Sequence, residues 1–316
     1  MKNKLMFMGT PDFAVYALDA LWKAFQDRFE FAVVTMPDKP VGRHWKLCPP
    51  PVKTFALAHG IPCHQPESLK RDCFESILHA FQPDCIVVAA FGRILPAYIL
   101  EYPRYLCVNI HASLLPAYRG ASPIHTAVMN GEKESGITIM KMAKGLDTGD
   151  IILQKKLPLE PHETVGSLHD KLAILGGKMI VEYVNKALHG NITLSPQEDA
   201  ISSYAAKIDN QTRKIYFDRP AEQVMWHIHG LSPFPGAMCR VESDGRQLKL
   251  YECRLTSVPT KETKPGTVLL QDKQILIACQ DVFLSVLSLQ EQGGKRMDAF
   301  PYINGRKIAN GDVLIP

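Results

Sequence analysis

Short apolar runs alternate with amphipathic stretches along the first 190 residues of the chain. The early runs are too continuously apolar for a half-exposed sheet, which is typical of strands that are buried on both faces. They predict strands at Leu5–Met8, Phe31–Thr35, Cys85–Ala90, Leu106–Ile110, Ile137–Met142 and Ile151–Leu157. The amphipathic stretches predict helices at Phe13–Phe25, Val52–His59, Cys73–Phe81, Ser122–Asn130 and Val165–Leu188.

This order of elements predicts an α/β fold, with a mostly parallel, Rossmann-like sheet and helices on both of its faces. In such sheets ligands bind beyond the carboxyl ends of the strands. Polar residues that directly follow a predicted strand are therefore the first candidates for a functional site.

The pattern changes near residue 190. Residues 190–209 are polar and irregular, and we interpret them as a linker. One predicted helix follows at Ala221–His229, and then come β-rich runs separated by turn residues, at Gln247–Leu255, Gly266–Leu270, Ile275–Ala278 and Val282–Leu289. These runs predict a smaller, antiparallel, OB-like β-barrel. We therefore expect one domain at residues 1–189 and a second at 210–316.

The composition is that of a globular enzyme. Hydrophobic residues make up 46% of the 316 residues and charged residues 22%, which excludes a disordered chain. The formal net charge is +4, and residues 210–316 hold 14 Lys and Arg against 11 Asp and Glu. This balance is compatible with a polyanionic partner but lies below that of dedicated nucleic-acid binders.

The eight cysteines are scattered singly along the chain, without a C-x-x-C pair. This usage favours reduced thiols in a cytoplasmic protein over a disulfide frame or a zinc site. No segment approaches the roughly 18 apolar residues that a spanning helix needs, so we expect no membrane span. After the first strand, Gly9–Phe13 lacks the later glycines of a G-x-G-x-x-G loop, which disfavours NAD or FAD.

Asn109 and His111 stand at the end of the strand predicted at Leu106–Ile110. Residues two apart in a strand face the same side, so the amide and the imidazole point to one place. Acyl transfer requires donors aimed at a developing oxyanion and a group that exchanges protons near neutral pH. The alternative is that Asn109 caps the strand and His111 is an ordinary core histidine.

A second cluster, Gly145–Asp150, lies between two predicted strands. A carboxylate beside His111 would hold the imidazole and favour its charged form, and Asp147 is the candidate. The sequence Asp-Thr-Gly is equally good turn chemistry, and Asp150 fits a surface turn.

The segment Met36–Lys53 is too long for a simple connection between elements. It carries the cations Lys39, Arg43, Lys46 and Lys53 against Asp38 alone, and it adds Trp45. Positive charge with a stacking surface favours an RNA contact, and the alternative is a solvated basic loop.

Together these motifs resemble the signature of the 10-formyltetrahydrofolate-dependent transformylases. The resemblance rests on Asn109-x-His111, Ser113–Pro116 with Arg119-Gly120, and Asp147-Thr148-Gly149. Four further stretches are similar to the members that formylate methionine on initiator tRNA, at Gly9–Phe13, Pro37–Arg43, Pro51–Lys53 and Phe91–Pro96.

The resemblance implies that 10-formyltetrahydrofolate donates its formyl group to an amine, without a metal. Asn109 and His111 would stabilise the oxyanion, and Asp147 would orient or charge His111 and assist proton removal. Folate would lie against Ser113, Leu114, Leu115 and Pro116, with Val88–Gly92 and Lys141–Asp147 as further walls. Arg119 either pairs with an anion or braces its loop.

The implied partner is initiator methionyl-tRNA, contacted by Lys39, Arg43 and Lys46 and by a diffuse basic face that includes Lys295, Arg296, Arg306 and Lys307. His44 and Trp45 depart from the family pattern, which usually continues there with glycine and lysine.

We expect a monomer. Three alternatives stay open: an amino-sugar formyltransferase or formyltetrahydrofolate hydrolase, an inactive RNA-binding module, and a dehydrogenase. A metal at His227 and His229 is disfavoured, because helical spacing turns the two rings to different sides.

Overall fold

The computed structural model describes residues 2–41, 45–305 and 307–316. The chain forms two compact units whose segments interleave. The first takes in the residues up to Gly120, Ser135–Leu157 and His169–Tyr204, and the second takes in Ala121–Glu134, Pro158–Leu168 and Ala205–Pro316. The division into domains at 1–189 and 210–316 stays a prediction. Within the described residues, no helix combines the length and the apolar character that crossing a bilayer requires.

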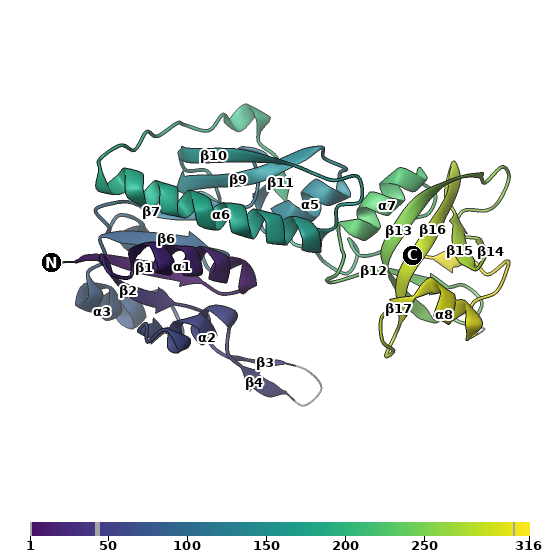
Figure 1. Cartoon of the computed structure of the whole chain (residues 1–316), viewed down its shortest axis with the longest axis horizontal. Coiled ribbons are helices and arrows are strands. Elements are labelled where there is room, and N and C mark those ends of the chain that lie inside the picture. Colours follow the sequence, from purple (N-terminus) through teal and green to yellow (C-terminus); the bar gives the residue numbers. More distant parts are fainter. Residues whose placement is uncertain (1, 42–44, 306) are drawn as a thin grey trace. The chain divides into compact units, whose positions relative to one another are not determined.

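A seven-stranded sheet organises the first unit, in the order β10-β9-β7-β6-β1-β2-β5 (Figure 1). Its strands are β1 (Asn3–Gly9), β2 (Phe29–Val34), β5 (Cys63–His64), β6 (Cys85–Ala89), β7 (Cys107–His111), β9 (Glu134–Lys141) and β10 (Ile151–Pro158). The neighbouring pairs β7–β6, β6–β1, β1–β2 and β2–β5 are parallel, and β9 pairs with β7 antiparallel. The prediction of a mostly parallel sheet is therefore confirmed.

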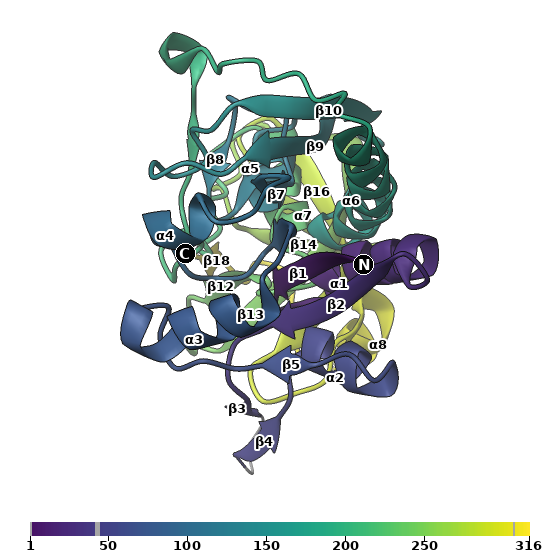
Figure 2. The same cartoon turned by 90° about the vertical axis from the view of Figure 1, so that its left-hand side faces the viewer.

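Helices cover both faces of this sheet, which confirms the predicted layers. They are α1 (Asp12–Phe25), α2 (Pro51–Ala58), α3 (Arg71–Phe81), α4 (Ala97–Leu100) and α6 (Val165–Leu188). Met6 and Met8 of β1 pack with Phe74 and Leu78 of α3 on one face. The intervening residues of β1 point to the other face, where α1 and α6 lie (Figure 2).

Two glycines bring α6 close to the sheet and to α1. A Cβ atom on Gly176 would lie 3.0 Å from Cγ2 of Ile110, and one on Gly177 would lie 3.1 Å from the carbonyl oxygen of Tyr16. Glycine inside a helix costs about 1 kcal/mol relative to alanine, and here it permits close packing. Ile110 stands between Asn109 and His111 on β7, so this packing buries the back of the strand that carries both candidate residues.

The second unit is built around an antiparallel sheet in the order β14-β15-β16-β13-β12-β18, with β17 paired to β16. The strands are β12 (Ala237–Val241), β13 (Gln247–Pro259), β14 (Val268–Gln271), β15 (Gln274–Ala278), β16 (Val282–Glu291), β17 (Met297–Asp298) and β18 (Leu314–Ile315). A bridge between Thr267 and Val313 joins the two ends of this order, so the sheet curls as the predicted barrel requires. Gly266 has φ +87° there, and a Cβ atom would collide with the backbone of Leu314.

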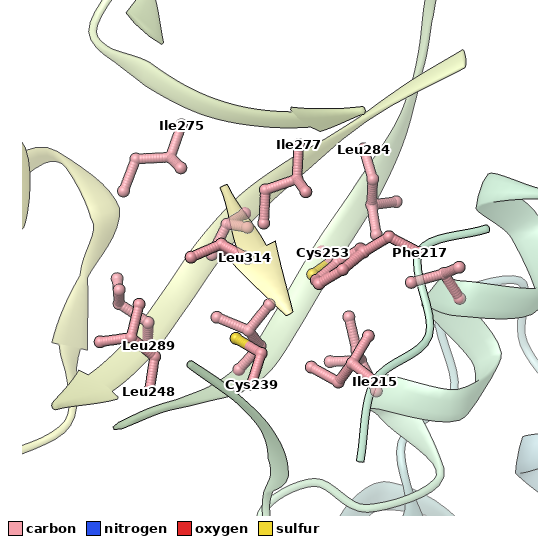
Figure 3. Close-up of a cluster of buried hydrophobic side chains, with 14 of the residues drawn as sticks. Ile215, Phe217, Cys239, Leu248, Cys253, Ile275, Ile277, Leu284, Leu289 and Leu314 are labelled. Carbon is pink, nitrogen blue, oxygen red and sulfur yellow. The ribbon is translucent and has the colours of Figure 1, made fainter. Parts of the chain in front are cut away.

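The interior of this curled sheet is apolar, with Ile215, Leu248, Ile277, Leu284 and Leu289 among its side chains (Figure 3). The helices of the second unit are α5 (Pro123–Met129), α7 (Ala221–His229) and α8 (Ala299–Asn304).

All eight cysteines of the chain are free thiols. The remaining short elements are the hairpin of β3 (Lys39–Val41) and β4 (Lys46–Cys48), the pair of β8 (Arg119–Gly120) and β11 (Tyr204–Ala205), and the 3₁₀ turn η1 (Asp199–Ile201).

Two histidines of α7 have imidazole rings that are largely buried in the second unit. Burial, and after it the charge of the nearby Arg219, lower the pKa of His227 to about 4. Burial likewise lowers the pKa of His229 to about 4. Nε2 of His229 accepts a hydrogen bond from the backbone N–H of Cys253, and Nε2 of His227 has no partner among the described residues. Both imidazoles are therefore neutral at physiological pH.

These histidines predict a loss of stability in mild acid. The unfolded chain protonates each ring near pH 6.5, whereas the folded protein resists protonation until about pH 4, so the unfolded state binds more protons between these values. At about 1.4 kcal/mol for each pKa unit, the free energy of unfolding should fall by on the order of 2–3 kcal/mol for each histidine as the pH drops through this window. Urea unfolding across this range should show a shallower dependence in the double variant His227→Gln/His229→Gln. An unchanged slope in that variant would contradict this origin.

Candidate active site

Asn109 and His111 lie on one face of β7, at its carboxyl end. In the parallel pair Asn109 lies opposite Val88 of β6, and in the antiparallel pair His111 lies opposite Thr138 of β9. His111 is buried and Asn109 is half-buried. The side-chain amide of Asn109 makes no hydrogen bond that involves the described residues, so its donors are available to a ligand. As the sequence predicted, side chains alternate along β7, so Asn109 and His111, two residues apart, face the same side.

The structure brings His111 and Asp147 together. Nδ1 of His111 lies 3.7 Å from Oδ2 of Asp147, and both side chains are largely buried. Nε2 of His111 lies 2.9 Å from the carbonyl oxygen of Tyr118. Because a carbonyl only accepts, Nε2 carries a hydrogen, and the other ring nitrogen is Nδ1. That nitrogen faces the carboxylate.

Two residues beside His111 have a left-handed backbone. Tyr118 has φ +60° and Asp147 has φ +52°. This conformation is unfavourable for residues other than glycine, and such outliers concentrate at functional sites. The backbone N–H of Gly120 donates to Oδ2 of Asp147 at 2.8 Å, which fixes the carboxylate oxygen that faces the imidazole.

Gly149 ends the Asp-Thr-Gly sequence at a point where no side chain fits. A Cβ atom there would lie 1.7 Å from the carbonyl oxygen of Lys141. The loop therefore lies directly on the end of β9, one strand away from His111. Turn chemistry and the placement of Asp147 are thus two parts of one feature, and Asp150 continues it by accepting from the N–H of Lys141.

The segment Ser113–Pro116 is held from behind by a buried threonine. Oγ1 of Thr138 donates to the carbonyl oxygen of Ser113 at 2.7 Å and accepts from the N–H of Leu115 at 3.2 Å. Gln154 donates to both Oγ1 of Thr138 and the carbonyl oxygen of Leu115. Leu114 and Pro116 stay partly accessible, and the Leu115–Pro116 bond is cis. Sequence analysis gave no sign of Thr138 or Gln154, because neither stands in a recognisable motif.

The long connection after β2 forms a hairpin. Lys39 of β3 pairs with Cys48 of β4, and Lys39 and Lys46 are exposed. Two apolar side chains beside them are also exposed, with Trp45 at 76% and Leu47 at 65%. Arg43 lies outside the described residues. The structure therefore places Lys39 and Lys46 on one projecting hairpin (Figure 1).

Lys53 is not a free cation of this hairpin. Its ammonium group lies 2.8 Å from Oδ2 of Asp38, and Gln65 donates to Oδ1 of the same carboxylate. Hydrogen bonds from Lys53 and then Gln65 lower the pKa of Asp38. The sequence count of cations against Asp38 alone missed this pair. It anchors the base of the hairpin instead of adding charge to its tip.

The expected basic face of the second unit is partly neutralised. Arg296 pairs with Glu252 and stacks on Tyr251, and Lys307 lies 3.2 Å from Glu291. Arg306 lies outside the described residues. Among the residues that the structure describes, no three potential ligands gather as a metal site would require.

Arg119 pairs with a carboxylate and also braces its loop, so the structure shows both of the alternatives that the sequence left open. Its guanidinium donates to Oε1 of Gln197 and to Asp199. Gln197 in turn contacts the loop of Asp147. The sequence offered no signal for Gln197, which stands in a polar stretch that reads as a linker.

Residues 2–184 match the profile of the family Formyl transferase, and residues 207–307 match that of Formyl transferase, C-terminal domain. The chain belongs to the formyl transferase family. A relative in this family, the methionyl-tRNA formyltransferase of Macrococcus caseolyticus, is 45% identical over 307 residues, which cover 96% of each protein.

Solved structures of the formyl transferase family share the fold. The N-formyltransferase of Helicobacter canadensis, in complex with folinic acid and dTDP-3-aminofucose, matches with a TM-score of 0.68 at 20% identity, over 94% of this chain and 100% of that one. The methionyl-tRNA formyltransferase of Clostridium thermocellum matches with a TM-score of 0.56 at 17% identity, over 80% of this chain and 94% of that one. At these identities the likeness concerns the fold alone.

The Thr138 network predicts a measurable cost for an isosteric change. Thr138→Val keeps the volume but leaves the N–H of Leu115 and the carbonyl of Ser113 without their buried partner. The free energy of unfolding should fall by about 1–3 kcal/mol. Thr54→Val, at an exposed helical threonine, is the control and should change it by less than about 0.5 kcal/mol. Equal effects of the two changes in chemical unfolding would contradict the proposed support.

Proposed function

We propose that this protein transfers the formyl group of 10-formyltetrahydrofolate to the amino group of methionine on initiator methionyl-tRNA. The observation that carries the proposal is the contact of His111 with Asp147 beside Asn109, in a chain 45% identical over nearly its full length to a methionyl-tRNA formyltransferase. A pair of donors beside a carboxylate fits a formyl carbonyl under attack by an amine.

The folate substrate supplies the formyl group. As the amine nitrogen bonds to the formyl carbon, charge develops on the formyl oxygen. The Asn109 amide and the Nδ1–H of His111 donate to that oxygen from one strand face. Asp147 stabilises the protonated imidazole and receives the proton that the amine loses. The bond from the formyl carbon to the folate nitrogen then breaks, and a proton returns to that nitrogen. The products are the formylated amine and tetrahydrofolate.

Folate is assigned to the segment Ser113, Leu114, Leu115 and Pro116, in which Ser113 and Leu115 are buried and Leu114 and Pro116 offer the accessible side chains. The support is local: the Thr138 network holds this segment rigidly, while Leu114 and Pro116 remain accessible next to His111 in the chain. Backbone groups of Val88–Gly92, at the end of the neighbouring strand, and of Lys141–Asp147 suit the edges of a flat polar heterocycle.

The tRNA is assigned to the β3–β4 hairpin through Lys39, Arg43 and Lys46, and to the C-terminal domain. Exposed lysines beside an exposed Trp45 combine phosphate-seeking charge with a surface on which a base can stack. A cytoplasmic monomer suits this partner, and light scattering of the purified protein tests the oligomeric state.

Removing either oxyanion donor should abolish most turnover in a folded protein. Asn109→Ala and His111→Ala should each lower kcat by on the order of 10² to 10³. The assay incubates each variant with methionine-charged initiator tRNA and 10-formyltetrahydrofolate and measures the blocked amino terminus. His189→Ala and Asn191→Ala, at exposed positions, are matched controls and should behave as wild type.

Wild-type-like turnover in both Asn109→Ala and His111→Ala would refute the assignment of the site. A wild-type protein that formylates an amino-sugar nucleotide but not the charged tRNA would refute the acceptor and leave the reaction standing.

The hairpin predicts a defect in tRNA affinity alone. Lys39→Ala/Lys46→Ala should raise KM for the tRNA by about tenfold and reduce the salt slope of binding by about one for each lost phosphate contact. Saturating kcat should stay unchanged, because in the described part of the chain the polar contacts of His111 are with Asp147 and Tyr118 and not with either lysine. Lys70→Ala/Lys178→Ala removes the same charge at exposed positions elsewhere. Equal changes in both double variants would show that net charge, and not the hairpin, governs binding.

A further inference from the structure

Gln197 is bound through its whole side-chain amide. Its Nε2 donates to the carbonyl oxygens of Asp147 at 2.9 Å and Gly149 at 2.6 Å. Its Oε1 accepts from Nε of Arg119 at 3.1 Å and from Nη2 at 2.8 Å. Because carbonyls only accept and a guanidinium only donates, this orientation of the amide is the one that satisfies all four bonds.

Both sets of partners lead to the carboxylate of Asp147. The carbonyl of Asp147 is held directly by Gln197, and the next residue after Arg119 is Gly120, whose N–H donates to Oδ2 of Asp147. Tyr118, one residue before Arg119, accepts from His111. Gln197 therefore joins the two segments that hold the imidazole and the carboxylate.

The segment around Gln197 is itself anchored on both sides. Ser195 exchanges backbone hydrogen bonds with Ile151, the first residue of β10, at 2.8 and 2.9 Å. Ser203 binds the backbone on the other side: its carbonyl accepts from the N–H of Arg119 and its hydroxyl accepts from the N–H of Tyr118. A side chain on a segment anchored in this way can hold its hydrogen-bonding partners in fixed positions.

The loop of Asp147 needs such support. Residues 143–146 and 148 are exposed, and Asp147 itself has the unfavourable φ of +52°. Without external bonds this backbone would relax, and the carboxylate would move from its position 3.7 Å from His111. Displacement of a reacting group by about 1 Å can cost about 100-fold in rate.

We propose that Gln197 is a positioning residue for the formyl transfer, acting through the backbone of Asp147 and through Arg119. This role rests on the proposed function. The side-chain amide of Gln197 is taken up by Arg119, Asp147 and Gly149, so we expect its contribution in the chemical step and not in substrate binding.

The test is Gln197→Glu, which keeps the shape and the bond to Arg119 but replaces the two N–H donors with an oxygen that repels the carbonyls of Asp147 and Gly149. We expect kcat to fall about 10- to 100-fold with KM for both substrates within about twofold of wild type. Asp199→Ala, which removes the exposed partner of Arg119 and leaves Gln197 in place, is the control and should retain wild-type kcat.

A double-mutant cycle separates positioning from general destabilisation. In an Asp147→Asn background the carboxylate is already absent, so Gln197→Glu should then change kcat by less than about threefold. The same loss in both backgrounds would overturn the proposal, as would a wild-type kcat for Gln197→Glu. Gln197→Ala serves the same cycle if the glutamate variant does not fold.

Hydrogen exchange gives a readout that does not depend on activity. The N–H of Gly120 and the amides of residues 145–150 should exchange faster in Gln197→Glu, while the amides of β1 and β6 stay protected. Unchanged exchange in the loop would overturn the positioning role. Absence of formyl transfer by the wild-type protein would instead count against the proposed function, so the two failures are distinguishable.

Discussion

The candidate site depends on the placement of the Asp147 carboxylate beside the His111 imidazole. Oδ2 of Asp147 lies 3.7 Å from Nδ1 of His111 and accepts from the N–H of Gly120. The other ring nitrogen donates to the backbone carbonyl of Tyr118, so Nδ1 is the ring nitrogen that faces the carboxylate. In the proposed reaction, proton transfer and oxyanion stabilisation meet at this one atom. The surrounding bonds hold that geometry against an unfavourable backbone conformation.

The sheet provides the rigid part of this arrangement and the loops provide the chemistry. β7 lies in the interior of the sheet, with β6 parallel on one side and β9 antiparallel on the other. Gly176 lets α6 pack closely behind it. The loops of Tyr118 and Asp147 lie beyond the strand ends, and each carries a left-handed residue. A stable scaffold can hold such strained loops, because its own stability comes from the buried strands.

Several cations of the β3–β4 hairpin and the second unit are paired with carboxylates. Lys53 is neutralised by Asp38 at the base of the β3–β4 hairpin, whereas Lys39 and Lys46 remain exposed toward its end. In the second unit Arg296 and Lys307 are paired with glutamates. Exposed pairs of this kind contribute little to stability. They leave the chain with a modest formal net charge of +4.

The sequence by itself determined the long elements, the two classes of sheet and the residue types of the site. Local hydrophobic periodicity specifies apolar strands such as β1 and β6 and amphipathic helices such as α1, and this periodicity is visible in the sequence. The two-residue strands and the β3–β4 hairpin were not predicted, because pairing partners and not propensity create them. The separation of 36 residues between His111 and Asp147 hides their contact from any local pattern. The sequence offered Asp147 as a candidate and the resemblance supported it, but only the tertiary structure brings the two side chains together. Gln197 was hidden for the same reason, since a polar residue in an irregular segment acquires a role only when the tertiary structure supplies four partners for its amide.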